Sequence, residues 1–189
     1  MKKQECLDRL TTVGGWISNA DSKIATGLGI FSFTGLFIGF IFTDNFDKLL
    51  ALKDKCCLYL FLLIIIFSLS LILFIVALLL FICGIIPRLS TGKSRKRKKQ
   101  KRNDIDEKVN FWFFKHVASF PDFESFLDAC ISKFGKVDFE CEQILEEVYA
   151  NSYICLTKMR LFKWGVILSF ISIFLSLLSI MMLVVPSLF

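Results

Sequence analysis

The chain has 189 residues, of which 55% are hydrophobic and 22 are Phe, and its formal net charge is +6. So high an apolar content excludes an ordinary soluble domain of this size. The apolar residues gather in three blocks, 24–43, 56–86 and 164–185, and none of the blocks contains Asp, Glu, Lys, Arg or His. Crossing a bilayer takes about 20 apolar residues. The sequence therefore predicts an all-α membrane protein with three transmembrane helices.

The segments between these blocks set the expected orientation. Residues 1–23 precede the first span, residues 44–55 link spans one and two, and residues 87–163 link spans two and three. Nine of the residues 87–102 are Lys or Arg, whereas the loop 44–55 balances three acids against three bases. Lys and Arg accumulate in cytoplasmic loops. We therefore expect residues 1–23 and 87–163 to be cytoplasmic, and residues 44–55 and the C-terminus to be external. No cleavable signal sequence is recognisable, so we expect the first span to be retained.

The basic run also has a second interpretation, as a nucleic-acid-binding tail. A cluster of Lys and Arg beside a span is better explained as a topology signal that rests on anionic lipid. We therefore expect no nucleic-acid partner.

Residues 1–23 have the pattern of an amphipathic helix. Cys6, Leu10, Val13 and Ile17 recur at helical spacing, and the same stripe continues to Asp21. Lys23 falls on a different face. A carboxylate on the apolar stripe is expected to face protein rather than water.

The cytoplasmic segment 87–163 is predicted to be a helical module. The pattern favours a helix from Asp104 to Phe120, and a second helix that begins after the N-cap residue Asp122 and ends at Gly135. From Val137 the helical pattern continues without a break into the third span. We therefore expect one continuous helix from the module through the membrane.

Small residues line one side of the first and third spans. Gly35 and Gly39 form a GxxxG in span one, and Ser169, Ser172 and Ser176 follow one another along span three. Such stripes allow close helix packing, or alternatively line a water path in an opened assembly. If spans one and three pack through these stripes, Asp21 and Lys158 come close enough to form an ion pair.

The residue types do not favour catalysis. The chain has one His, no Gly-rich phosphate loop and seven Cys without CxxC spacing. We expect no enzyme activity, no catalytic residues, no metal site and no cofactor. Cys56 and Cys57, at the outer face, are a possible site of oxidation.

Three stretches give the chain a resemblance to the Pycsar transmembrane effector family of bacterial anti-phage defence. They are "WISNADSKIATGLGIFSF" at span one, "FWFFKHVASFPDFESF" in the module and "QILEEVYANSYICLTKMRLFKWG" before span three. The resemblance implies a partner pyrimidine cyclase that makes cyclic CMP or cyclic UMP. It also implies that the chain responds to that nucleotide and impairs the inner membrane, causing abortive infection. A holin-like toxin with another trigger and a structural membrane subunit remain alternatives.

A cyclic nucleotide carries one negative charge and a flat base, so its site needs a cation, polar groups and an apolar wall. The cytoplasmic end of the spans offers these groups, and the candidate ligand residues are Asp21, Lys23, Asn151, Ser152 and Lys158. An alternative location is the module between Asp104 and Phe134. Three helices cannot enclose a useful pore, so we also expect a homo-oligomer.

Overall fold

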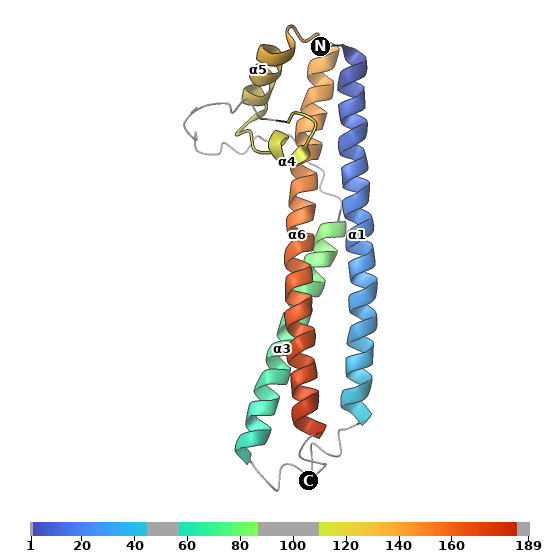
Figure 1. Cartoon of the computed structure of the whole chain (residues 1–189), viewed down its shortest axis with the longest axis vertical. Coiled ribbons are helices and arrows are strands. Elements are labelled where there is room, and N and C mark those ends of the chain that lie inside the picture. The colour runs from blue at the N-terminus through green and yellow to red at the C-terminus, as the bar shows by residue number, and fades with distance from the viewer. Residues whose placement is uncertain (1, 45–56, 87–109, 185–189) are drawn as a thin grey trace. The chain divides into compact units, whose positions relative to one another are not determined.

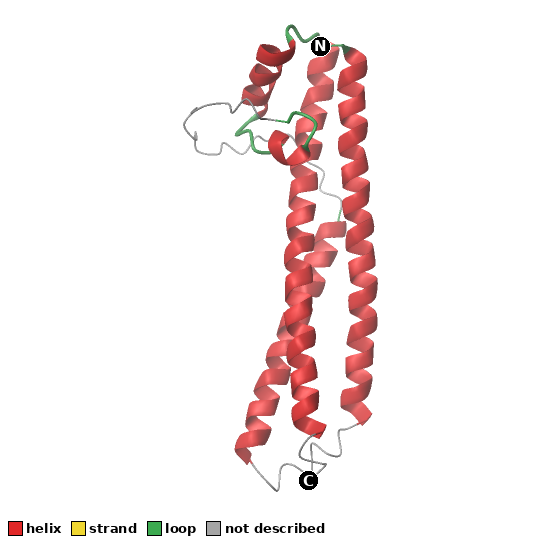
Figure 2. Cartoon of the chain, viewed as in Figure 1, coloured by secondary structure: helices red, strands yellow, loops and turns green. Residues whose placement is uncertain are grey.

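The computed structural model describes residues 2–44, 57–86 and 110–184, and every regular element in these ranges is a helix (Figure 2). The helices are α1 (Lys3–Asp44), α3 (Cys57–Ile85), α4 (Phe114–Val117), α5 (Phe123–Phe134) and α6 (Phe139–Val184) (Figure 1). The all-α prediction is confirmed for these residues. The external loop, Cys56, the side chain of Cys57 and the basic run 87–102 lie outside the described part of the chain.

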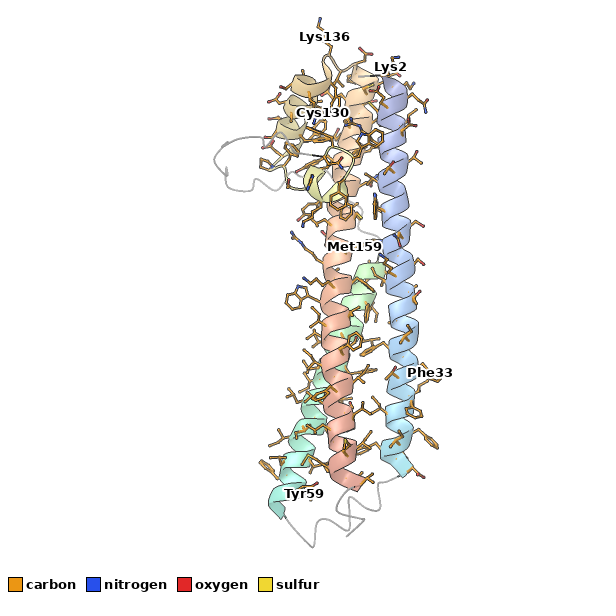
Figure 3. The ribbon with its side chains drawn as sticks, viewed as in Figure 1. Lys2, Phe33, Tyr59, Cys130, Lys136 and Met159 are labelled. Carbon is orange, nitrogen blue, oxygen red and sulfur yellow. The ribbon has the colours of Figure 1, made fainter. Side chains whose placement is uncertain are left out.

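Three of the helices are long and apolar enough to cross a membrane: α1, residues Tyr59–Ile85 of α3, and α6. Large apolar side chains on them are exposed rather than buried. Phe33 of α1 is 74% exposed and projects away from the neighbouring helices (Figure 3), and Phe170 of α6 is 70% exposed. Exposed apolar surface on this scale suits a lipid environment, where all backbone polar groups are satisfied within the helices. The chain is a membrane protein.

The chain divides into two compact units. The first combines Met1–Ser22 with Ile86–Arg160, and the second combines Lys23–Ile85 with Leu161–Phe189. We call the first unit the helical module and the second the span unit. Both α1 and α6 are uninterrupted helices that contribute residues to both units.

The core of the helical module forms where α1, α5 and α6 meet the segment before α4. The α1 stripe predicted from the sequence supplies Cys6 and Val13, which are 0% and 2% exposed. They share one core with Phe111, with Val117 of α4, with Phe126, Ala129 and Cys130 of α5, and with Cys141, Leu145 and Val148 of α6. The amphipathic pattern of residues 1–23 is therefore confirmed, although these residues form one helix with the first span.

Three predictions about this part of the chain are confirmed. Asp122 caps α5, its side chain accepting a 2.8 Å hydrogen bond from the Ser125 N–H. Gly135 ends the helix with φ of 83°, a conformation that favours glycine. The continuous helix expected from Val137 is present and begins at Phe139.

The predicted helix from Asp104 to Phe120 is wrong within the described residues, where only Phe114–Val117 is α-helical. Asn110 provides the physical reason. Its side chain accepts a 2.9 Å hydrogen bond from the Trp112 N–H, and its own N–H donates to His116 Nδ1 at 3.1 Å. Such local side-chain bonds offer the backbone an alternative to the helix.

Aromatic rings of α3 fill the core of the span unit. Phe31 and Phe74 stack with ring centroids 4.1 Å apart, and Phe81 is 2% exposed. Glycines make room for these rings. A Cβ atom at Gly35 would lie 2.5 Å from Phe74, and one at Gly165 would lie 3.0 Å from Phe81.

These contacts differ from the expectation that the small stripes of spans one and three pack on each other. Gly35, Ser172 and Ser176 instead have their described partners on α3, because its Phe and Ser side chains occupy the space beside these small residues. Ser70 of α3 donates a 3.0 Å hydrogen bond to the Ser172 carbonyl and lies 2.5 Å from Ser176 Oγ.

Candidate functional site

An ion pair within the helical module joins α1 to α6. Lys158 Nζ donates to Asp21 Oδ1, as expected from the positions of these residues in the sequence. The Lys158 side chain is 9% exposed and that of Asp21 is 45% exposed. The partly exposed carboxylate keeps some hydration, whereas the buried ammonium depends on its partner. Removal of Asp21 would leave an uncompensated buried charge, which is strongly destabilising.

The other three candidate ligand residues are not joined to this pair. Lys23 is exposed and Asn151 is half-buried, whereas Ser152 is fully buried and its Oγ has no hydrogen-bond partner in the described part of the chain. No described hydrogen bond or ion pair connects any of the three with Asp21 or Lys158. The structure therefore brings together two of the five residues.

An aromatic wall lies beside the apolar face of α1. The Trp16 ring centroid lies 5.7 Å from that of Phe114 and 6.2 Å from that of Phe113. These contacts hold the segment around α4 against α1 within the module. They provide apolar surface but no charged group.

The residues proposed for helix packing fall into two groups. Ser172 and Ser176 form hydrogen bonds with Ser70 across the contact with α3. Ser169 Oγ instead donates a 2.7 Å hydrogen bond to the Gly165 carbonyl of its own helix. The Phe74 ring occupies the space beside Gly35, whereas a Cβ atom at Gly39 would meet nothing within 4 Å. Gly39 therefore has no close packing role within the described chain.

Arg9 of α1 forms a second charged centre. This centre was not predicted from the sequence. Arg9 is 2% exposed, and its Nε and Nη1 atoms have no hydrogen-bond partner among the described residues. Its Cζ atom lies 4.5 Å from the Phe134 ring centroid and 5.1 Å from that of Trp112. We call Arg9, Phe111, Trp112, Cys130 and Phe134 the Arg9 cluster.

The Arg9 cluster is unusual because, among the described residues, its buried positive charge is contacted by aromatic rings rather than by a carboxylate. Each cation–π contact of this kind contributes about 0.5 to 2 kcal/mol, whereas burying an ion without a partner costs several kcal/mol. No carboxylate in the described ranges forms a salt bridge with Arg9. Burial raises the pKa of the Cys130 thiol to about 11, with the Arg9 charge and hydrogen bond acting in the opposite direction, so the thiol does not supply a negative charge at neutral pH.

The sequence did contain a signal for Arg9. It lies three residues after Cys6 and four before Val13, both on the buried stripe, so the helical period places its charge on the apolar face. Its aromatic neighbours come from 100 or more residues further along the chain. Helical spacing cannot reveal such contacts.

The described residues contain no group of three or more His, Cys, Asp or Glu side chains that could hold a metal ion. The buried polar side chains of the described chain are instead cations and hydroxyls, and the carboxylate that pairs with Lys158 is partly exposed. Three apolar helices, two of which continue into a charged helical module, define a small α-helical membrane protein.

The comparison with protein families agrees with that class. Residues 6–185 match the Pycsar effector protein domain, so the chain belongs to this family. It is a membrane effector of Pycsar anti-phage defence, and its family is not one of enzymes. The comparisons with curated proteins and with solved structures found no match.

Proposed function

We propose that a cyclic pyrimidine nucleotide, cyclic CMP or cyclic UMP, switches this effector into a form that impairs the inner membrane and causes abortive infection. The nucleotide comes from a partner pyrimidine cyclase. The observation that carries the proposal is the Asp21–Lys158 ion pair, which fastens α1 to α6. Each of these helices continues as one helix into a membrane span.

In the resting state the ion pair restrains the two helices. Nucleotide binding favours an arrangement in which the pair is broken and the spans can reassociate. A ligand shifts such an equilibrium only by its difference in affinity for the two arrangements. The buried Lys158 makes the pair sensitive to small helix movements, because its compensation depends on one carboxylate.

The orientation follows from the basic run. With residues 87–102 in the cytoplasm, the helical module faces the compartment where a cyclase releases its product. Residues 1–23 then lie on the same side, and the C-terminus is external. The membrane concerned is the inner membrane of a bacterium.

Membrane damage requires several copies. Three helices of one chain are packed around Phe81 and Phe74, so one copy encloses no path. The exposed face of α1 that carries Gly39 is available for contact with a second copy.

Co-expression with a pyrimidine cyclase tests the proposal. Loss of membrane potential and cell death should occur only when the effector is present with an active cyclase, and not with a cyclase whose active site is disabled. Death without any cyclase would instead support a holin-like toxin. No death in either case would support a structural subunit.

The five residues at the cytoplasmic end of the spans remain an alternative ligand site. Lys158 would then leave Asp21 for the phosphate, with Asn151 and Ser152 contacting the base or ribose and Lys23 nearby. In that case Lys158→Ala and Asn151→Ala would abolish nucleotide binding while leaving expression and membrane insertion intact. If both variants bind the nucleotide as wild type does, the site lies in the module.

A further inference from the structure

Arg9 is a buried cation that the proposed switch does not use. Only 2% of its surface is exposed, and both Nε and Nη1 lack a hydrogen-bond partner among the described residues. A buried guanidinium normally bonds a carboxylate, a phosphate or a row of carbonyl oxygens. Here the faces of Phe134 and Trp112 contact it instead.

The free donors match one class of ligand. A guanidinium presents its N–H groups in a planar fork, which suits the two free oxygens of a phosphodiester. A second cation lies at the same cluster, since Lys133 Nζ is 5.0 Å from the Phe111 ring centroid. The cluster therefore offers two positive charges to an anion.

The cluster also offers a surface for a flat ring. Phe111 and Phe134 pack edge to face with centroids 5.4 Å apart and are committed to the core contact. Trp112 is 43% exposed and is the accessible aromatic member. Aromatic side chains of this kind stack on nucleobases.

We infer that the Arg9 cluster binds a cyclic pyrimidine nucleotide, with the phosphodiester on the Arg9 guanidinium and the base on the Trp112 ring. The inference rests on the proposed function and assigns recognition to the helical module, leaving the Asp21–Lys158 pair as the restraint. Arg9 is covered in this structure, so binding requires Trp112 to move aside. The liganded arrangement of the module therefore differs from this one, as a switch demands.

Arg9 and Asp21 lie on the same helix, about three turns apart. A ligand that enters between Arg9 and Trp112 acts on the helix that the ion pair holds. Recognition and restraint are thus coupled through α1 alone.

Membrane phospholipids present the same anionic phosphodiester without a base. The two sources can be separated, because only the nucleotide needs the Trp112 ring. The test measures binding of cyclic CMP and cyclic UMP by calorimetry, using the full chain in nanodiscs of neutral lipid. A second set of nanodiscs contains anionic phosphatidylglycerol.

Each variant changes one feature of the proposed site. Arg9→Lys keeps the charge but loses the fork, Trp112→Ala removes the ring, and Trp112→Phe keeps an aromatic face. Lys3→Gln is the matched control, since Lys3 is an exposed cation of α1 that pairs with Glu140 at 2.7 Å. We expect at least a tenfold loss of affinity for Arg9→Lys and a roughly 5- to 150-fold loss for Trp112→Ala. Trp112→Phe and Lys3→Gln should stay within about threefold of wild type.

Each of the following results would refute the proposed function, the Arg9 cluster as the nucleotide site, or both. Wild-type chain that binds neither nucleotide refutes the proposed function and the inference with it. Wild-type binding that Arg9→Lys and Trp112→Ala leave unchanged refutes the Arg9 cluster alone. Nucleotide binding that disappears in phosphatidylglycerol nanodiscs, with Trp112→Ala having no effect in neutral lipid, assigns the cluster to a lipid headgroup.

Discussion

Lys158 and Asp21 lie 137 residues apart in the sequence and form an ion pair in which the ammonium is nearly buried and the carboxylate is about half exposed. This asymmetry leads to the first prediction. Asp21→Asn keeps the shape of the side chain but leaves Lys158 with no compensating charge. The loss is about 1 to 3 kcal/mol, between the values for exposed and for buried pairs.

Asp21→Asn should therefore raise toxicity in cells that lack a cyclase, measured as membrane depolarisation after induction. Asp8→Asn, which changes an exposed acid of the same helix, is the control and should have no effect. The exchange Asp21→Lys with Lys158→Asp should restore the resting state in part. Toxicity equal to wild type in Asp21→Asn, at equal protein level, would show that the pair does not restrain the effector.

The two glycines of the GxxxG should behave differently. A Cβ atom at Gly35 would lie 2.5 Å from the Phe74 ring, which is itself stacked on Phe31. Gly35→Ala should destabilise the packing of α1 on α3 by about 1 to 3 kcal/mol, as overpacked cores do. Gly39→Ala meets open space and should be neutral for one copy.

Gly39→Leu then becomes a test of assembly. We expect it to leave helix content unchanged but to lower the oligomer fraction seen by chemical cross-linking in membranes, together with killing. An unchanged oligomer and unchanged killing would remove Gly39 from the contact between copies.

The serines between α3 and α6 should contribute modestly to stability. Ser70 Oγ bonds to the Ser172 carbonyl, and Ser172 Oγ donates 2.9 Å to the Ser70 carbonyl in return. Ser70→Ala should cost about 0.6 kcal/mol and at most about 1.7 kcal/mol, the range for such bonds in membrane proteins. Unfolding of the detergent-solubilised protein in SDS measures the difference.

Ser68→Ala, at an exposed position on the same helix, controls for the loss of a hydroxyl. The alternative that the serines line a water path predicts another result: killing would fall in Ser70→Ala, Ser172→Ala and Ser176→Ala while stability stayed the same.

The cap of α5 should make the helical module sensitive to acid. Hydrogen bonding to Ser125 lowers the pKa of the Asp122 carboxyl below its ordinary value. A lowered pKa in the folded state stabilises the fold above the ordinary value near pH 4, and this contribution disappears as the pH falls through the folded pKa.

Asp122→Ala should therefore destabilise the protein by about 1 kcal/mol at pH 7, and its difference from wild type should shrink at pH 3. Thermal unfolding followed by circular dichroism at both pH values measures the effect. Asp128→Ala, at an exposed position of α5, is the control. A difference that persists at pH 3 would mean that charge is not the basis of the cap.

Regular features of this protein could be predicted from the sequence because they depend on local periodicity. The buried stripe of Cys6 and Val13, the cap at Asp122 and the unbroken α6 all follow from spacing and residue type. The Asp21–Lys158 pair could be predicted as well, since both residues continue stripes that face protein.

Other features depend on contacts between distant segments. The spacing of Gly35 indicated a close approach but not its partner, which is an aromatic ring of α3. The turn at Asn110 replaced a helix that the apolar pattern favoured, because side-chain bonds to the backbone compete with helix formation. The aromatic neighbours of Arg9 could be identified only from the fold, since Trp112 and Phe134 lie 100 or more residues further along the chain.

The buried thiols of the module give the protein internal reporters of its own movement. Cys6 of α1 and Cys141 of α6 are 0% and 1% exposed and lie in the same core. A maleimide can reach them only when these helices separate. The rate at which these two thiols are alkylated in living cells would therefore follow the opening of the effector, and would show whether opening precedes the loss of membrane potential.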